Sequence, residues 1–148
     1  MLTRASVEIN APAAEVWDIF SDVEHWHEWT KSVTRLDGLD GPQIAIGNRY
    51  AIKQPRLPKL VWTVTEVTPG TSWTWEQRSP GGRTVARHEV VALSAGRTLV
   101  RQELEQAGPI GSVVARLMLR TTKRYLDLEG EGLKDRAENA RNHSGPAS

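Results

Sequence analysis

Apolar residues between Pro109 and Asn139 recur three or four positions apart, the spacing that gathers side chains on one face of a helix. The recurring positions are Ile110, Val113, Val114, Leu117, Thr121, Tyr125 and Leu128. Charged residues fall between them, namely Arg116, Arg120, Lys123, Arg124 and Asp127. The pattern predicts one long amphipathic helix, whose apolar face needs a partner surface from the rest of the chain.

Upstream of this helix the sequence predicts strands and two short helices. Alternation over 2–10 indicates a first strand, and Pro12 then opens a helix over 13–20, because proline suits a first helical turn. A second short helix over 25–30 places Trp26 and Trp29 on one face. Further strands are predicted at 34–39, 48–54, 60–68, 71–79, 83–94 and 97–106. Two-residue turns are expected at Pro69-Gly70, Gly81-Gly82 and Ala95-Gly96.

The alternation also predicts which face of each strand is buried, because charged residues cannot cheaply be buried without partners. Outward positions are Arg87, Glu89, Arg101, Glu103 and Glu105. Inward positions are then Trp73, Trp75, Gln77, Ala86, His88, Val90, Ala92, Val100, Gln102 and Leu104. The strand over 60–68 leaves two alternatives: either Trp62 and Val64, or Val61, Thr63 and Val67, face inward. We favour Trp62.

Composition narrows the function classes. A chain of 148 residues suits one domain, and 19 basic against 18 acidic residues leave no large field to attract nucleic acid or an anionic membrane. In the last helix, acidic residues are mixed with the basic ones, so its charged face is explained by contact with solvent. These acidic residues are Asp127, Glu129, Glu131, Asp135 and Glu138. No cysteine, secretory leader or membrane-spanning run is present, so we expect a cytoplasmic protein.

Motifs for metal, nucleotide or nucleophilic chemistry are missing from the sequence. His25 and His27 lie two apart on a predicted helix and point nearly opposite ways, so we expect no metal site and no cofactor. His88 is the candidate catalytic residue, since a histidine facing a cavity can move a proton near neutral pH. The alternative is a structural histidine that is hydrogen-bonded to Gln102 across the strand pair.

One stretch of sequence resembles a known family. The run Val7-Glu8-Ile9-Asn10-Ala11-Pro12, followed by Val16-Trp17 and then Asp22, Trp26 and Trp29, is similar to the opening of the polyketide cyclase/dehydrase and lipid-transport family. That family belongs to the SRPBCC superfamily, whose members resemble START proteins and the birch-pollen allergen. Later segments with the same likeness are 62–66 before Pro69-Gly70, 73–76 after it, His88, and Gly96-Arg97-Thr98.

The resemblance implies an α+β helix-grip fold. A curved seven-stranded antiparallel sheet would wrap around the long C-terminal helix, with two short helices after the first strand. We expect one such domain over 1–141 and a disordered tail over 142–148. An internal cavity would hold an apolar or aromatic small molecule. Its expected ligand-binding residues are Tyr50, Trp62, Trp75, His88, Gln102, Leu117, Met118, Thr121 and Tyr125.

Three functions stay open at this stage. The first is binding of a small hydrophobic, aromatic or polyketide-like molecule. The second is a cofactor-free cyclase or dehydratase, in which His88 and Gln102 polarise a carbonyl or move a proton. The third is a protein adaptor or a homodimer without a ligand.

Gly130 and Gly132 weaken the last helix, because glycine disfavours the helical conformation, so the backbone either packs closely there or bends. We predict that this glycine pair, together with the 54–59 loop, forms part of a gate through which a ligand enters the cavity.

Overall fold

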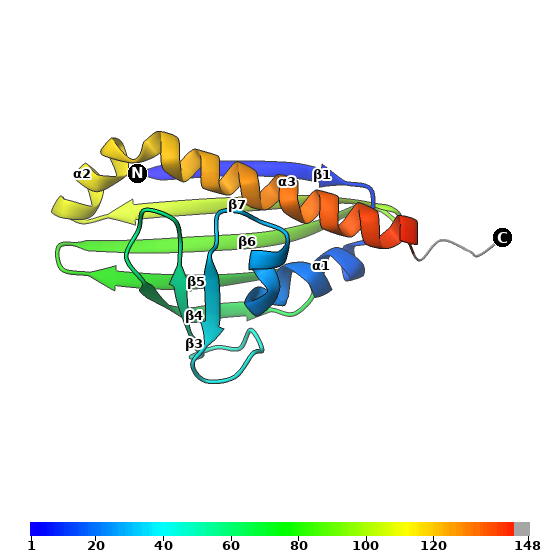
Figure 1. Cartoon of the computed structure of the whole chain (residues 1–148), viewed down its shortest axis with the longest axis horizontal. Coiled ribbons are helices and arrows are strands. Elements are labelled where there is room, and N and C mark those ends of the chain that lie inside the picture. Colours follow the sequence, from blue (N-terminus) through cyan, green and yellow to red (C-terminus); the bar gives the residue numbers. More distant parts are fainter. Residues whose placement is uncertain (144–148) are drawn as a thin grey trace.

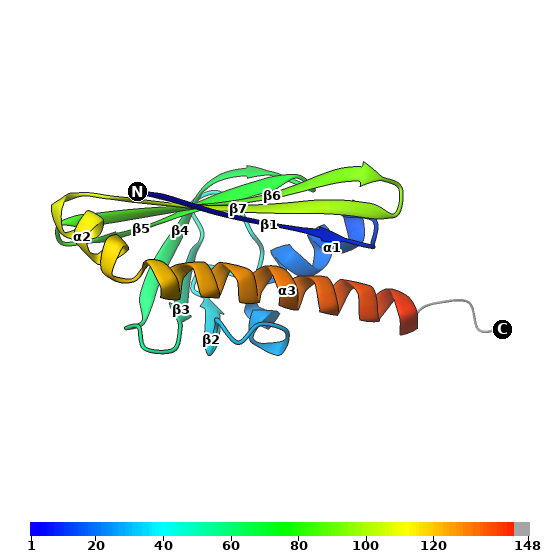
Figure 2. The same cartoon turned by 90° about the horizontal axis from the view of Figure 1, so that it is seen from above.

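The computed structural model describes residues 1–143, and within them a seven-stranded antiparallel sheet curves over a long C-terminal helix (Figures 1 and 2). The elements are β1 (Leu2–Ile9), α1 (Ala13–Ser21), the 3₁₀ helix η1 (Val23–Glu28), β2 (Arg35–Gly38), β3 (Arg49–Lys53), β4 (Leu60–Thr68), β5 (Ser72–Ser79), β6 (Gly82–Ser94), β7 (Arg97–Ala107), α2 (Pro109–Leu117) and α3 (Leu119–His143). The spatial order β1-β7-β6-β5-β4-β3-β2 places the first strand beside the last. The predicted helix-grip architecture is confirmed.

The inner face of the sheet follows the predicted alternation with two local exceptions. Trp62 and Val64 are buried and Val61 is exposed, as the favoured alternative requires. A bulge after Val64 then returns Val67 to the inner face, opposite Trp73, so part of the other alternative is inside as well. The prediction for Ala92 is wrong: it is exposed, next to a register shift between Ala92 and Ser94.

Two of the three turns lie where the sequence predicts them. Gly70 has φ +81° in the β4–β5 turn, and Ser94 pairs with Arg97 across the Ala95-Gly96 turn. The β5–β6 turn is shifted by one residue, because Ser79 pairs with Gly82 and Pro80-Gly81 occupies the loop.

Aromatic side chains fill the space between the sheet and the first two helices. The Phe20 and Trp26 rings stack with centroids 5.6 Å apart, and Trp26 Nε1 donates to the Phe20 carbonyl at 2.8 Å. Trp73 meets Phe20 edge-on at 4.8 Å. Trp73, predicted to face inward, therefore packs against α1.

The predicted single C-terminal helix is wrong, because the chain breaks at Met118 (φ −105°, ψ 14°) into α2 and α3. The buried stripe of α3 consists of Leu126, Glu129, Gly130, Leu133 and Ala137. On α2 the predicted apolar face is exposed instead, and the side chain most exposed is Leu117, at 81%.

A cluster of glycines explains the orientation of α2. The Gly81 carbonyl accepts hydrogen bonds from the N–H groups of Ile110 (2.9 Å) and Gly111 (3.0 Å), which pins the start of α2 to the β5–β6 turn. A Cβ at Gly111 would lie 3.1 Å from the Gly82 Cα, closer than most real Cβ contacts, so a larger residue would push the two backbones apart by a few tenths of an ångström. Gly111 and the buried Ala115 thus lie on the inner side of α2, whereas Ile110, Val113, Val114 and Leu117 are each at least 40% exposed.

Close packing, rather than a bend, accounts for Gly132 in α3. A Cβ at Gly132 would lie 1.9 Å from the Trp29 carbonyl oxygen, whereas one at Gly130 would make an ordinary contact, 3.4 Å from Val7 Cγ1. The helix runs through both positions without a break. Of the tail predicted over 142–148, residues 142 and 143 belong to the last turn of α3, and 144–148 lie outside the described residues.

This packing predicts opposite effects for two alanine substitutions. Gly132→Ala should destabilise the fold by roughly 1–3 kcal/mol, because the new methyl group meets backbone that must shift. Gly130→Ala is the matched control and should stabilise by up to about 1 kcal/mol, through helix propensity alone. Urea unfolding of both variants measures the difference, and equal free energies of unfolding would contradict the packing.

Candidate ligand-binding pocket

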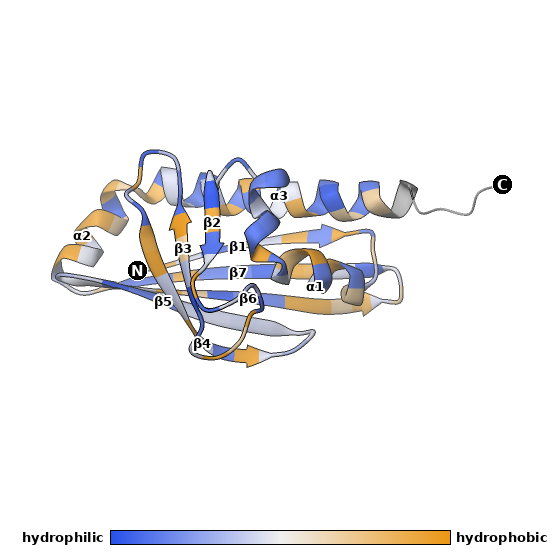
Figure 3. Cartoon of the chain, turned by 60° about the horizontal axis from the view of Figure 1, so that its bottom comes forward, coloured by the Kyte–Doolittle hydropathy of each residue, from blue (hydrophilic) through white to orange (hydrophobic). Residues whose placement is uncertain are grey.

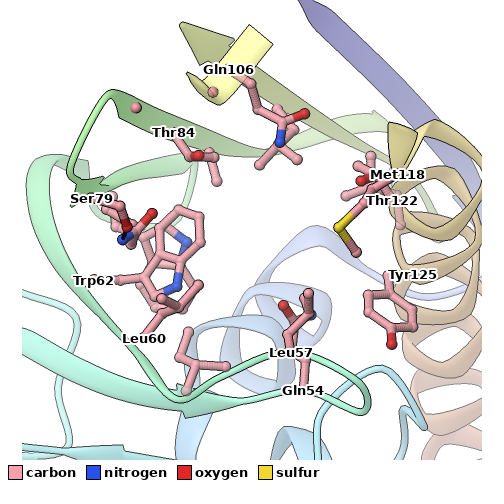
Figure 4. A pocket seen from close by; sticks show the side chains of 18 of the residues that line it. Gln54, Leu57, Leu60, Trp62, Ser79, Thr84, Gln106, Met118, Thr122 and Tyr125 are labelled. Atoms are coloured by element: carbon pink, nitrogen blue, oxygen red, sulfur yellow. Dashed lines mark hydrogen bonds between the residues drawn. The ribbon is translucent and has the colours of Figure 1, made fainter. Parts of the chain in front are cut away.

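A cavity of about 330 Å³ lies between the inner face of the sheet, the loop between β3 and β4, and helices α2 and α3. Figure 4 shows Leu60 and Trp62 on one side of it, with Met118, Thr122 and Tyr125 projecting from the helical side opposite. The loop is tied to the helix, because the Tyr125 hydroxyl donates a hydrogen bond to the Pro55 carbonyl. The pocket wall is mainly apolar and aromatic.

His88 contributes a neutral imidazole to this pocket. Its ring is stacked on Trp73 with centroids 4.1 Å apart, and its Nδ1 lies 3.3 Å from the Trp73 carbonyl oxygen. Burial lowers the pKa of His88 to about 3, so the ring is uncharged near pH 7. Because a carbonyl only accepts, Nδ1 carries the proton and Nε2 is left as an acceptor.

Glu129 is a second titratable group of the pocket wall, and the prediction that it belongs to a solvated face is wrong. Its side chain is buried, and its Oε1 accepts a hydrogen bond from the Ser32 hydroxyl at 3.1 Å. Burial raises the pKa of Glu129 to about 7, although the Ser32 hydrogen bond opposes this. No basic side chain within residues 1–140 forms an ion pair with it. The carboxyl therefore changes its protonation state near neutral pH.

One sequence signal could have found this carboxylate. Glu129 follows Leu126 by three positions and precedes Leu133 by four, which places all three on one helical face. Two of the residues predicted from the sequence to face inward, Leu117 and Thr121, each lie one position before a residue that lines the pocket, Met118 and Thr122. The predicted apolar phase is therefore about one residue too early on both sides of the break at Met118.

Gln102 and Gln106 carry unused acceptor capacity. Gln102 Nε2 donates to the Leu126 carbonyl at 3.4 Å, whereas its Oε1 is buried and has no partner among the described residues. The same holds for Gln106 Oε1, and both residues line the pocket. His88 and Gln102 face each other in register, but the hydrogen bond predicted between them is not formed. An unsatisfied buried acceptor costs roughly 1–3 kcal/mol, so a ligand donor would be favoured here.

The structure brings together most of the residues predicted to bind a ligand. Those that line the pocket are Trp62, Trp75, His88, Gln102, Met118 and Tyr125. Their role as ligand contacts stays a prediction. Three others are absent from the pocket wall, and their predicted positions are wrong: Tyr50, Leu117 and Thr121.

Each of the three has a physical reason. Tyr50 is fully buried against Trp75, with ring centroids 5.7 Å apart, and its hydroxyl donates to the Gln43 carbonyl. Leu117 points to solvent at the end of α2, and Thr122 rather than Thr121 lines the pocket, because the inward face of both helices lies about one position later than the predicted apolar phase.

Metal ligands do not gather anywhere among residues 1–143: no group of three or more histidine, aspartate or glutamate side chains could share an ion. His25 Nδ1 contacts Asp22 Oδ1 at 2.9 Å, while His27 Nδ1 contacts the Glu24 carbonyl at 3.1 Å. The two imidazoles therefore have separate partners.

The arrangement of sheet, helix and pocket has counterparts in known proteins. The model of the family "Polyketide cyclase / dehydrase and lipid transport" matches residues 2–138. The chain belongs to this family. No curated protein sequence matches it significantly.

Solved structures of low identity share the fold. A hypothetical protein from Helicobacter pylori superposes with a TM-score of 0.80 at 14% identity, over 93% of this chain and 88% of that one. The ZhuI aromatase/cyclase from a Streptomyces species gives 0.74 at 18%, over 100% and 98% of the two chains. A START superfamily protein from Mycobacterium smegmatis gives 0.72 at 19%, over 94% and 98%. At these identities the likeness establishes the fold alone.

The pKa of Glu129 makes a prediction for stability. Its folded value of about 7 exceeds the ordinary value of 4.5, so its contribution is fully present below pH 4.5 and is lost as pH rises through 7. Glu129→Gln removes this loss and should gain stability relative to the parent chain, by roughly 3 kcal/mol at most, between pH 4.5 and 8.

Urea unfolding across that pH range measures the difference. Glu131→Gln, which changes an exposed glutamate two residues along α3, is the control and should give a flat difference. If Glu129→Gln also gave a flat difference, the carboxyl would not titrate from a buried position.

Proposed function

We propose that the chain binds a small, mostly apolar molecule that carries hydrogen-bond donors. One observation supports this above all: an apolar and aromatic cavity of about 330 Å³ contains polar atoms with unused bonding capacity. The volume is at the lower end of the roughly 300–1,000 Å³ typical of ligand pockets. It suits a compact aromatic molecule or a short chain.

The chemistry of the wall narrows the ligand class. Trp62 and Trp75 offer flat faces for stacking on a ring. Gln102 Oε1 and the Nε2 of His88 are acceptors, and Glu129 accepts when ionised and donates when protonated. Hydroxyl groups, such as those of a phenol or an enol, match this set best. A hydroxylated aromatic or a polyketide-like molecule fits the pocket and agrees with the family.

Filling the cavity should abolish binding of a neutral apolar probe. Met118→Trp replaces a lining side chain with a larger one, and we expect it to reduce the affinity for N-phenyl-1-naphthylamine at least tenfold. Leu117→Trp is the matched control, because it introduces the same side chain one residue earlier. Leu117 is exposed and lies outside the pocket wall, so this variant should leave the affinity unchanged. Probe fluorescence measures both, and equal loss in the two variants would refute a ligand site here.

A second candidate function is a cofactor-free cyclase or dehydratase, and the pKa of Glu129 favours it. A carboxyl with a pKa of about 7 is suited to general acid–base catalysis at neutral pH. As a carboxylate, Glu129 would take a proton from a carbon beside a carbonyl of a linear polyketone; the carbanion would add to a second carbonyl and close a ring, and the carboxyl would return the proton to the alkoxide. Glu129 would then take the second proton from the same carbon and donate it to the departing hydroxyl, which would leave as water as the carbon–carbon double bond forms. The likeness to an aromatase/cyclase supports this reading through the fold only.

Glu129→Gln separates binding from catalysis. The amide keeps the size and hydrogen-bonding of the carboxyl but cannot transfer a proton, so turnover of a linear polyketone thioester should fall roughly 10²–10⁴-fold. Binding of N-phenyl-1-naphthylamine should stay within a few-fold. Product formation is followed by mass spectrometry, with Glu131→Gln as the control. A wild-type rate equal to that of the Glu129→Gln variant would rule out Glu129 as the acid–base group, and a wild-type rate equal to the uncatalysed rate would leave the binding protein.

A further inference from the structure

Helix α2 presents an apolar face to solvent. Ile110, Val113, Val114 and Leu117 lie at the spacing of one helical face and are 57%, 58%, 40% and 81% exposed. Leu119, the first residue of α3, is 40% exposed. Figure 3 shows α2 as a largely hydrophobic segment at one end of the molecule. Folded chains in water rarely leave such a face uncovered, so it calls for a partner.

Basic residues adjoin this face. Between positions 109 and 126 the chain has four basic residues and no acidic one: Arg116, Arg120, Lys123 and Arg124. All four are exposed, and within residues 1–140 none has an ion-pair partner. The preceding acidic residues, Glu103 and Glu105, are instead hydrogen-bonded to Arg4 and Arg87. The net charge of the whole chain is only +1 and therefore gives no sign of this local excess of positive charge.

The face is preformed rather than induced. The hydrogen bonds from Ile110 and Gly111 to the Gly81 carbonyl hold the start of α2, and the close Gly111–Gly82 contact opposes a rotation that would turn its larger side chains inward. The same helix borders the cavity, since Val114 and Met118 are part of its wall. The exposed face and the pocket thus lie at the same end of the molecule.

We propose that α2 and the first turns of α3 dock the protein on the surface of an anionic lipid bilayer. The aliphatic side chains would enter the boundary between headgroups and acyl chains, and the four cations would lie at the level of the lipid phosphates. An aliphatic face without aromatic anchors is unlike the centre of a protein interface. Its apolar middle does not suit a nucleic acid either, which binds through phosphate contacts.

The protein would lie on the bilayer and not cross it. The 9 residues of α2 span about 13 Å at 1.5 Å per residue, well short of the roughly 30 Å hydrocarbon core. No helix within residues 1–143 is long and apolar enough to cross a membrane. Because the pocket lies beside α2, a docked protein would take its ligand from the bilayer. This inference about the ligand rests on the proposed function, whereas the docking itself does not.

Vesicle flotation tests the docking directly with the full chain and no added ligand. We expect binding to phosphatidylcholine vesicles that contain about 30% phosphatidylglycerol, and much weaker binding to phosphatidylcholine alone. Leu117→Asp should lower the affinity at least tenfold, because a charge replaces the most exposed apolar side chain. Arg120→Gln with Lys123→Gln should lower it about 25-fold, at roughly fivefold for each cation lost.

Two control variants change residues outside α2 and α3. Leu93 lies at the far end of the sheet, next to the β6–β7 turn (Figure 1), and Lys31 precedes β2. Leu93→Asp removes an apolar side chain that is 46% exposed, and Lys31→Gln removes one exposed cation; neither should change vesicle binding. Binding of N-phenyl-1-naphthylamine shows that each variant is folded. If the parent chain bound vesicles but did not bind the probe, the proposed function would be overturned and the docking would stand.

Three outcomes would overturn the docking. The first is no binding to anionic vesicles. The second is binding that Leu117→Asp leaves unchanged. The third is a homodimer, measured by analytical ultracentrifugation, that Leu117→Asp dissociates while vesicles stay unbound; a second copy of the chain would then be what covers α2.

Discussion

The close approach of α3 to the N-terminal part of the chain is the contact on which the pocket depends. Gly132 lets the helix backbone reach the Trp29 carbonyl, and the neighbouring Gly130 lies against Val7. The Gly132 contact sets the rotation of α3 about its own axis. Because Glu129 immediately precedes Gly130, the same rotation buries its carboxyl beside Ser32 and places Tyr125 where its hydroxyl reaches the loop at Pro55. The helix thus packs closely against the N-terminal segment at Gly132, although glycine by itself disfavours the helical conformation.

Burial gives the two titratable groups of the pocket opposite protonation behaviour. It disfavours charge in both, so His88 stays neutral far below pH 7 and Glu129 keeps its proton up to about that pH. His88 therefore stabilises the fold above its ordinary pKa of 6.5 and loses that contribution as pH falls, whereas Glu129 loses its own as pH rises. Such a pair fits either selective binding of a hydroxylated molecule or proton transfer to it. The family contains both kinds of protein by description, and the fold does not choose between them.

Helix α2 connects the pocket to the outside. Its glycine-rich start is fixed to the β5–β6 turn, its inner side borders the cavity, and its aliphatic side is exposed beside four cations. A net charge of +1 for the chain gave no reason to expect this. Charge acts over about a Debye length, roughly 8–10 Å, so the local grouping of like charges matters more for a surface than the total.

Local patterns in the sequence were enough to predict the strands, the inner face of most of them and the family. Period-two alternation is a local property, and charged residues mark the outer face wherever they occur, as Arg87 and Glu103 do. The same reasoning could not place Glu129 inside, Tyr50 behind Trp75, or Leu117 in solvent. Those positions follow from contacts between segments far apart in the chain, of Gly111 with Gly82 and of Gly132 with Trp29. They could not be predicted from the chain alone, because helical periodicity shows which side chains share a face but not which way that face is turned.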